Sequence, residues 1–160
     1  MVQIADMNPD LERFMLDYRW RRLDGIAPAH RVKDVAKCRV ALVSSAGLVA
    51  PGQEPYDSKI KGGDWTWRSI PVGVDVRSLT EHHRSDSWSR DGIEADRNMG
   101  MPLDRLRELA EAGVIGEVAP HHVSVQGSIT APGRFIRKTV PEIVEALVAD
   151  EVDVALMVPV

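Results

Sequence analysis

Several common features are missing from this sequence. Cys38 is the only cysteine, so an internal disulfide is excluded and nothing indicates an oxidising compartment. There is no basic excess: 20 Lys and Arg stand against 24 Asp and Glu, a net charge of -4, which argues against nucleic acid as a partner. No stretch approaches the roughly 20 apolar residues of a membrane helix. The first ten residues also lack the basic start and apolar core of a secretory signal. We therefore expect a cytoplasmic protein without a membrane partner.

The residues that are present have the composition of a soluble globular protein, with 44% apolar and 28% charged residues. No internal repeat or low-complexity linker divides the chain, and a chain of this length can bury a sizeable core. We expect residues 1–160 to form a single α/β domain.

Three segments have helical patterns. The first is expected to begin after Asn8. The clearest is MPLDRLRELAEAG, with Pro102 at its start and Gly113 as its stop. Thr139 followed by Glu142 forms a capping box that begins a last helix, VPEIVEALVAD.

Short apolar runs alternate with these helices. Val40–Val43 and Val152–Val158 are apolar throughout, which is typical of strands buried on both faces of a parallel sheet. We expect the two to be parallel and near each other in the sheet centre. Residues 69–74 and 121–127 have strand character, and residues 49–69 are expected to leave the sheet. The alternation predicts an open, mainly parallel sheet flanked by helices, Rossmann- or flavodoxin-like.

Ligands of open α/β sheets lie beyond the carboxyl ends of the strands. After the first strand, the hydroxyls of Ser44 and Ser45 and the backbone near Gly47 could hold an anion such as a carboxylate, although an ordinary turn explains them equally well. The polar loop 85–100, introduced by His82 and His83, and the pair His121–His122 are the other candidates.

These residues also allow two functions of other classes. The charged loop is also what a solvated, self-paired surface loop looks like. The histidines allow a metal-dependent hydrolase using His82 and His122, but no HxxxH or HExxH spacing supports a metal site. A non-catalytic module that binds a small molecule is the second alternative.

Four stretches, in order, resemble the selenoprotein B family of glycine, sarcosine, betaine and D-proline reductases, especially its shorter stand-alone members. They are RVALVSSAGLVAPGQEPYD, GGDWTWRSIP, GIEADRNMGMPLDRLRELAEAGVIGEVAPHHVSVQGSI and ADEVDVALMVPV. The resemblance implies an oxidoreductase that cleaves an amino acid or amine-type substrate, with electrons from a thiol or thioredoxin-type donor. It also implies other reductase subunits as partners. We further expect the chain to form a homo-oligomer.

In that family the last stretch continues into a loop with a selenocysteine or cysteine, which is the nucleophile. The resemblance therefore implies that the catalytic residue lies immediately after Val160, that the chain holds no cofactor, and that the fold is incomplete at its C-terminus. Our hypothesis is that a recoded UGA codon follows Val160; an engineered boundary or a degraded gene are the alternatives. We expect the 160-residue chain alone to be inactive and to be marginally stable or self-associating.

The resemblance also selects positions. Arg90 and Asp91 depart from the family pattern, which often has an acidic residue beside a histidine there. The positions that match the family are Ser45, Gly47, Gly63, Asp64, Asp96, Asn98, Pro102, Asp104, His122, Ser124 and Gly127. Together with the loop argument, they give the predicted substrate-binding residues: Ser44, Ser45, Gly47, His82, Asp86, Asp91, Asn98, His122 and Ser124.

Overall fold

The structure is a computed structural model. It describes residues 7–19, 25, 27, 29–30, 33–85 and 90–160. The chain divides into two units, residues 1–30 and 31–160. The first unit contains helix α1 (Pro9–Asp17), which begins as predicted because the side chain of Asn8 accepts a hydrogen bond from the backbone N–H of Leu11 at 2.9 Å.

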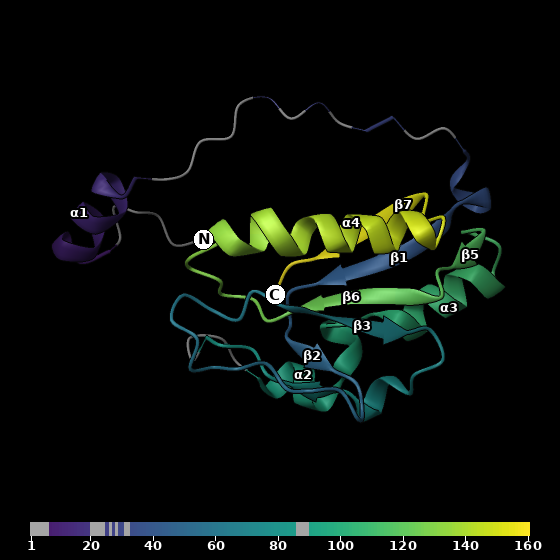
Figure 1. The fold of residues 1–160 in the computed structure, drawn as a ribbon, viewed down its shortest axis with the longest axis horizontal. Helices are drawn as coiled ribbons and strands as arrows, with labels where there is room; N and C mark the ends of the chain where they lie inside the picture. Colours follow the sequence, from purple (N-terminus) through teal and green to yellow (C-terminus); the bar gives the residue numbers. More distant parts are fainter. Residues whose placement is uncertain (1–6, 20–24, 26, 28, 31–32, 86–89) are drawn as a thin grey trace. The chain divides into compact units, whose positions relative to one another are not determined.

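The second unit is built on a five-stranded, mostly parallel sheet (Figure 1). Its strands are β1 (Arg39–Ser44), β3 (Trp67–Pro71), β5 (Glu117–Val118), β6 (His121–Val125) and β7 (Val154–Val158). Strand β1 pairs in parallel with β7 along one edge and with β5 and β6 along the other, and β3 is antiparallel to β6. The predicted α/β class is confirmed.

Helices cover both faces of this sheet. On one face, α4 (Val140–Ala149) packs through Ile143 against Val123 and Val125 of β6. On the other, α3 (Leu103–Glu111) belongs to the main core with the apolar residues of β1. The minor elements are β2 (Leu48–Val49) and β4 (Thr80–Glu81), which form a separate antiparallel pair, α2 (Asp91–Ala95), and the short turns η2 (Val35–Lys37), η3 (Val76–Ser78), η4 (Arg97–Met99) and η5 (Phe135–Thr139). Within the described ranges, no helix is long and apolar enough to cross a membrane.

The predicted capping box at the start of α4 is wrong. Thr139 has helical dihedrals, because the π-helical turn η5 runs directly into α4 and makes Thr139 an interior residue. Its hydroxyl donates to the backbone carbonyl of Trp65 instead of capping the helix. The bounds of β3 also differ from the prediction, since pairing with β6 places its start at Trp67 and its end at Pro71.

Strand β7 is parallel to β1 and adjacent to it, as predicted, with five paired residues. It is not a buried central strand, however. In the described part of the chain it pairs only with β1, so it forms an edge of the sheet, and Leu156 and Met157 are 47% and 64% exposed. A doubly apolar strand on an edge leaves part of its side-chain surface uncovered.

Candidate functional site at the carboxyl ends of the strands

The carboxyl ends of β1, β6 and β7 meet at the loop that follows β1. The backbone N–H of Ser45 donates to the carbonyl of Val158 at 3.1 Å, and that of Gly47 donates to the carbonyl of Val125 at 2.9 Å. The backbone N–H of Val160 donates to the hydroxyl of Ser45 at 3.0 Å. This short loop therefore joins all three strand ends, on the side where the C-terminus lies in Figure 1.

Gly47 lets a second segment pass directly over this loop. It has a φ of +66°, and its carbonyl accepts a hydrogen bond from the backbone N–H of His82 at 2.9 Å. A Cβ at Gly47 would lie 2.8 Å from the backbone nitrogen of His83, so only glycine fits. The ring of His82 faces the hydroxyl of Thr80 at 3.2 Å rather than the strand ends.

His83 is the histidine whose ring reaches the strand ends. Its side chain packs against Gly127, which has a φ of +75° and lies two residues after Val125, the end of β6. The ring nitrogen Nδ1 accepts from the backbone N–H of Ser85 at 3.1 Å, which assigns the proton of the neutral ring to Nε2. Burial lowers the pKa of His83, and the ring is therefore neutral at pH 7.

Three polar side chains lie in a row on one face of β6 and its continuation: His122, Ser124 and Gln126. All three are fully buried, at 0% exposure. Nδ1 of His122 accepts from the backbone N–H of Leu42 at 3.0 Å, and Oε1 of Gln126 accepts from the backbone N–H of Asp64 at 2.7 Å. The other polar atoms, Nε2 of His122, Oγ of Ser124 and Nε2 of Gln126, have no hydrogen-bond partner among the described residues. Buried polar atoms of this kind usually bond to internal water or to a ligand.

The register of the sheet corrects the prediction for His122. Ser44 of β1 lies level with Ser124 and Val158, so His122 lies two residues before the strand ends, inside the sheet. The adjacent His121 is exposed and pairs with Asp150. His122 is thus a core residue in the face of the sheet and not part of a binding loop.

Ser44 and Ser124 have mainly structural partners. The hydroxyl of Ser44 donates to the carbonyl of Gly100 at 2.5 Å and accepts from the backbone N–H of Ala46 at 3.1 Å. The carbonyl of Ser124 accepts from the hydroxyl of Tyr56 at 2.7 Å. Both serines therefore fasten neighbouring segments to the strand ends, and Ser45 is the serine that borders the meeting point.

Asp64 ties the turn after Gly63 to the same end of the sheet. Its carboxylate accepts from the backbone N–H groups of Asp57 and Thr66, both at 2.9 Å, and from the Thr66 hydroxyl at 2.6 Å. Burial alone would raise its pKa, but these hydrogen bonds outweigh burial and lower it. Because its own backbone N–H donates to Gln126, Asp64 also fixes the orientation of that side chain.

Replacing Asp64 by alanine is expected to lower the free energy of unfolding by about 2 to 3 kcal/mol, because it leaves two partly buried N–H donors and the Thr66 hydroxyl without their acceptor. Asp57→Ala is the matched control, since among the described residues the Asp57 carboxylate accepts only an exposed bond from the backbone N–H of Lys59. We expect Asp57→Ala to cost less than about 1 kcal/mol in urea denaturation. Equal costs for the two variants would contradict this role of Asp64.

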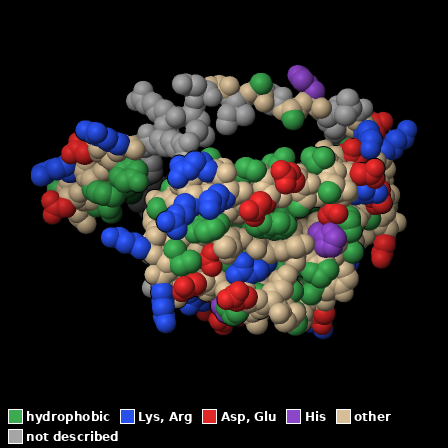
Figure 2. All heavy atoms as spheres, in the orientation of Figure 1, with side chains coloured by type: hydrophobic (Ala, Val, Ile, Leu, Met, Phe, Trp, Pro, Cys, Tyr) green, Lys and Arg blue, Asp and Glu red, His purple; other side chains and the backbone are tan. Residues whose placement is uncertain are grey.

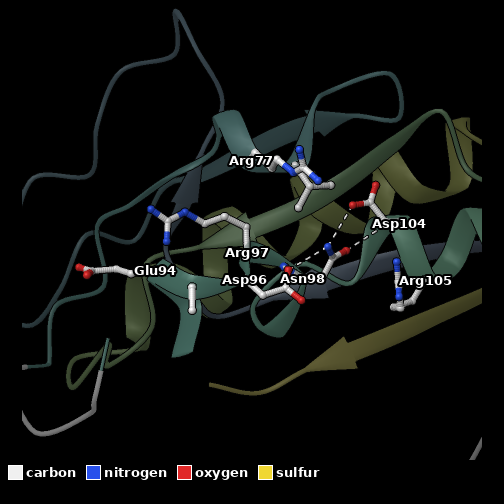
Figure 3. A pocket seen from close by; sticks show the side chains of 9 residues that line it. Arg77, Glu94, Asp96, Arg97, Asn98, Asp104 and Arg105 are labelled. Carbon is white, nitrogen blue, oxygen red and sulfur yellow. Dashed lines mark hydrogen bonds between the residues drawn. The ribbon is translucent and has the colours of Figure 1, made fainter. Parts of the chain in front are cut away.

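Asn98 lies in a separate hollow of about 580 Å³, beside the start of α3 (Figure 3). Its amide donates to Asp104 and accepts from the backbone N–H of Asp104, at 3.0 and 3.1 Å, and it also donates to Asp96 at 3.0 Å. The side chain is therefore engaged in holding the first turn of α3. Arginines and carboxylates both line the hollow, so its charge is largely balanced.

The remaining predicted residues do not join the strand ends. Asp91 is exposed at the start of α2, and Asp86 lies outside the described residues. In the described ranges, no group of three or more His, Cys, Asp or Glu side chains could hold a metal ion. The structure thus places Ser44, Ser45, Gly47 and Ser124 at the strand ends and His82 beside them through its backbone. His122, Asp91 and Asn98 lie elsewhere.

Sequence reasoning named His83 beside the candidate loop but did not count it among the substrate-binding residues. It missed Gln126, and it reached Gly127 only through a family resemblance. A signal for two of them was present: Gln126 and Gly127 are the last residues of the segment 121–127, which has strand character, and ligand-binding loops begin where such strands end. Nothing in the sequence indicates that His83, rather than His82, turns its ring toward Gly127.

The chain is similar to known reductase components. The sequence model of the family described as glycine/sarcosine/betaine reductase selenoprotein B (GRDB) matches residues 6–159. Sarcosine reductase complex component B subunit beta of Peptoclostridium acidaminophilum is 34% identical over 129 residues, covering 76% of this chain and 28% of that protein. Glycine reductase complex component B subunit gamma of the same organism is 29% identical over 153 residues, covering 91% and 33%.

D-proline reductase subunit gamma of Acetoanaerobium sticklandii is 28% identical over 125 residues, covering 78% of this chain and 50% of that protein. The chain thus spans between about a quarter and a half of the length of these curated relatives. No solved structure matches it.

Proposed function

The chain belongs to the glycine/sarcosine/betaine reductase selenoprotein B family, and we propose that it forms the substrate-binding part of a reductase component. The substrate in this proposal is a small amino acid or amine of the glycine, sarcosine, betaine or D-proline class. The observation that carries the proposal is the convergence of Ser45, Gly47, His83 and Gly127 where β1, β6 and β7 end, the position of ligands in open α/β sheets.

The chemical step in this proposal needs a nucleophile that Cys38 cannot provide. Cys38 is fully buried at the start of β1, and its thiol donates to the carbonyl of Asp34 at 3.2 Å. The strand separates it from Ser45 at the carboxyl end. A buried thiol in an apolar setting is a weak nucleophile, because the reactive form is the exposed thiolate. Since Cys38 is the only cysteine of the chain, the nucleophile of the proposed reaction lies outside residues 1–160.

We place that nucleophile, a selenolate or thiolate, next to the end of β7, where the backbone N–H of Val160 donates a hydrogen bond to the hydroxyl of Ser45. It attacks the substrate carbon that carries the amine, a carbon–selenium or carbon–sulfur bond forms, and the amine departs with the bonding electrons. A thiol of the donor then attacks the selenium or sulfur, and the carbon leaves with that electron pair and takes up a proton. A second donor thiol releases the nucleophile as the donor becomes a disulfide. The donor is of the thioredoxin type, and other reductase subunits are partners in this proposal.

The test is to read the codons that follow Val160 and to express the in-frame continuation with cysteine at the position of the nucleophile. Thiol-dependent cleavage of glycine, sarcosine, betaine and D-proline is then measured, with the other reductase subunits present. We expect cleavage of at least one substrate by the longer protein and by its Cys38→Ala variant, and none by residues 1–160.

Cysteine alkylation of the 160-residue chain should be slow until the chain unfolds, because Cys38 is buried.

Two outcomes would contradict the proposal. The first is cleavage by residues 1–160 that Cys38→Ala abolishes, which would make Cys38 the nucleophile. The second is a gene in which no codon for selenocysteine or cysteine follows in frame, which would leave the proposed reaction without its nucleophile.

A further inference from the structure

A second hollow, of about 600 Å³, lies where η5 begins and is separate from the strand-end residues. Lys61, Arg134 and Arg137 line it together with the indole of Trp65, and no acidic residue of the described ranges does. Figure 2 shows Lys and Arg side chains gathered around the N-terminal end of α4. This concentration of positive charge occurs in a chain whose net charge is -4.

Two glycine-containing loops make the walls of this hollow and hold each other in place. Gly62 and Gly63 have φ values of +92° and +101°. A Cβ at Gly62 would come closer than 3.0 Å to Ala131, and one at Gly63 would lie 3.0 Å from the Cα of Ile129. The backbone N–H of Ala131 also donates to the carbonyl of Gly62 at 3.1 Å. The hollow is therefore formed by close backbone packing and needs no ligand to assemble it.

The basic side chains have no anionic partner in the described part of the chain. Lys61, Arg134 and Arg137 make no ion pair with a carboxylate there, whereas Arg39, Arg90 and other cations of the chain do. The Arg137 guanidinium instead lies over Gly133, 3.4 Å from where a Cβ would be. The Lys138 ammonium lies 5.6 Å from the centroid of the Trp65 ring.

We propose that this hollow binds a small molecule through a phosphate group. Two guanidinium groups can each donate two parallel hydrogen bonds to the oxygens of a phosphate, and a lysine adds a point charge. An amino acid fits this lining poorly, because no carboxylate of the described residues lines the hollow to accept its ammonium group. The site goes beyond the proposed reductase function, since none of its lining residues belongs to the strand-end cluster.

The test is titration of the 160-residue chain with inorganic phosphate and with pyrophosphate at constant ionic strength. Binding is followed by NMR through the indole N–H of Trp65 and the backbone N–H of Gly133. We expect saturable shifts at both, tighter for pyrophosphate because it carries more charge, and at least about 10-fold weaker binding of acetate and glycine. Arg134→Gln and Arg137→Gln should each weaken pyrophosphate binding at least about 10-fold.

Arg105→Gln is the matched control. It removes the same charge from an exposed arginine that pairs with Glu108, outside this hollow, and should leave pyrophosphate binding unchanged. Arg137→Lys keeps the positive charge but cannot donate two parallel hydrogen bonds. Its affinity for pyrophosphate should lie between those of the wild type and Arg137→Gln, which separates a loss of binding from a general loss of folding. Shifts that do not saturate, or an equal loss in Arg105→Gln, would overturn the proposal. Because no reductant or substrate is involved, this result is independent of the reductase test.

Discussion

Replacing Gly127 by alanine is expected to lower the free energy of unfolding by about 2 to 5 kcal/mol. Two costs add at this position. A residue other than glycine is strained at its φ of +75°. The new methyl group would also come closer than 3.0 Å to the Ser45 carbonyl oxygen and to the His83 ring, and the carbonyl belongs to backbone that joins the strand ends. Urea denaturation of the variant and the wild type measures the difference.

Gly52→Ala separates the two costs. Gly52 has a φ of +82°, similar to that of Gly127, but nothing lies within 4 Å of a Cβ built on it. We expect this variant to show only the backbone cost, about 1 to 2 kcal/mol. If both variants lose the same stability, the close contact of Gly127 with Ser45 and His83 does not constrain the protein, and the strand-end cluster is looser than the structure shows.

The parts of the fold that were predicted correctly depend on local signals. Val40–Val43 is apolar on both faces because β1 has a strand on either edge and a helix layer on either face. Helix α3 follows Pro102 and is followed by Gly113, which has the left-handed φ of +70° that terminates helices. These signals lie within one turn of the residues they define, so sequence alone was enough.

The parts that were predicted wrongly depend on distant segments. Val154–Val158 has the same apolar pattern as β1, but its exposure is decided by which strands pair with it, and within the described ranges only β1 does. Thr139 has the spacing of a helix cap, but its hydroxyl bonds to Trp65 in a loop remote in sequence. Local spacing cannot predict either outcome.

The same distinction holds for the candidate site. The strand-end rule found Ser45 and Gly47, because both follow a recognisable strand. His122 was predicted to bind a ligand although residues 121–127 already have strand character, and the structure places it within the strand, which begins at His121. His83 was not predicted to bind substrate because its role depends on packing against Gly127, and that contact joins segments with no common pattern.

Because His122 is buried inside the sheet, it should make the stability of the protein sensitive to acid. Burial lowers its pKa to about 4, with a further contribution from the positive charge of Arg107. In the unfolded chain the imidazole has a pKa of about 6.5. Between these two values the unfolded state binds more protons than the folded state, so the free energy of unfolding falls as the pH falls. His83, whose pKa is also lowered by burial, acts in the same direction.

This contribution to the free energy of unfolding is about 3 kcal/mol. It is complete above about pH 6.5 and is lost by about pH 4. The carboxylates with lowered pKa values, Asp64, Asp96 and Asp153, lose their contribution only below about pH 3.9, so they act mainly beneath this window. Urea denaturation at a series of pH values between about 7 and 4 should therefore report mainly the two buried histidines.

His122→Asn isolates the contribution of His122. The amide oxygen of asparagine can accept the backbone N–H of Leu42, as Nδ1 of the histidine does, but the amide does not titrate. The smaller side chain will lower stability at every pH, so the informative quantity is the slope of the free energy of unfolding with pH. We expect that slope to decrease markedly in His122→Asn and to persist in His121→Asn, which changes the exposed neighbour. His83 leaves a residual slope in this variant, so the outcome that contradicts the prediction is a slope equal to that of the wild type, which would mean that His122 takes up protons equally in the folded and the unfolded protein.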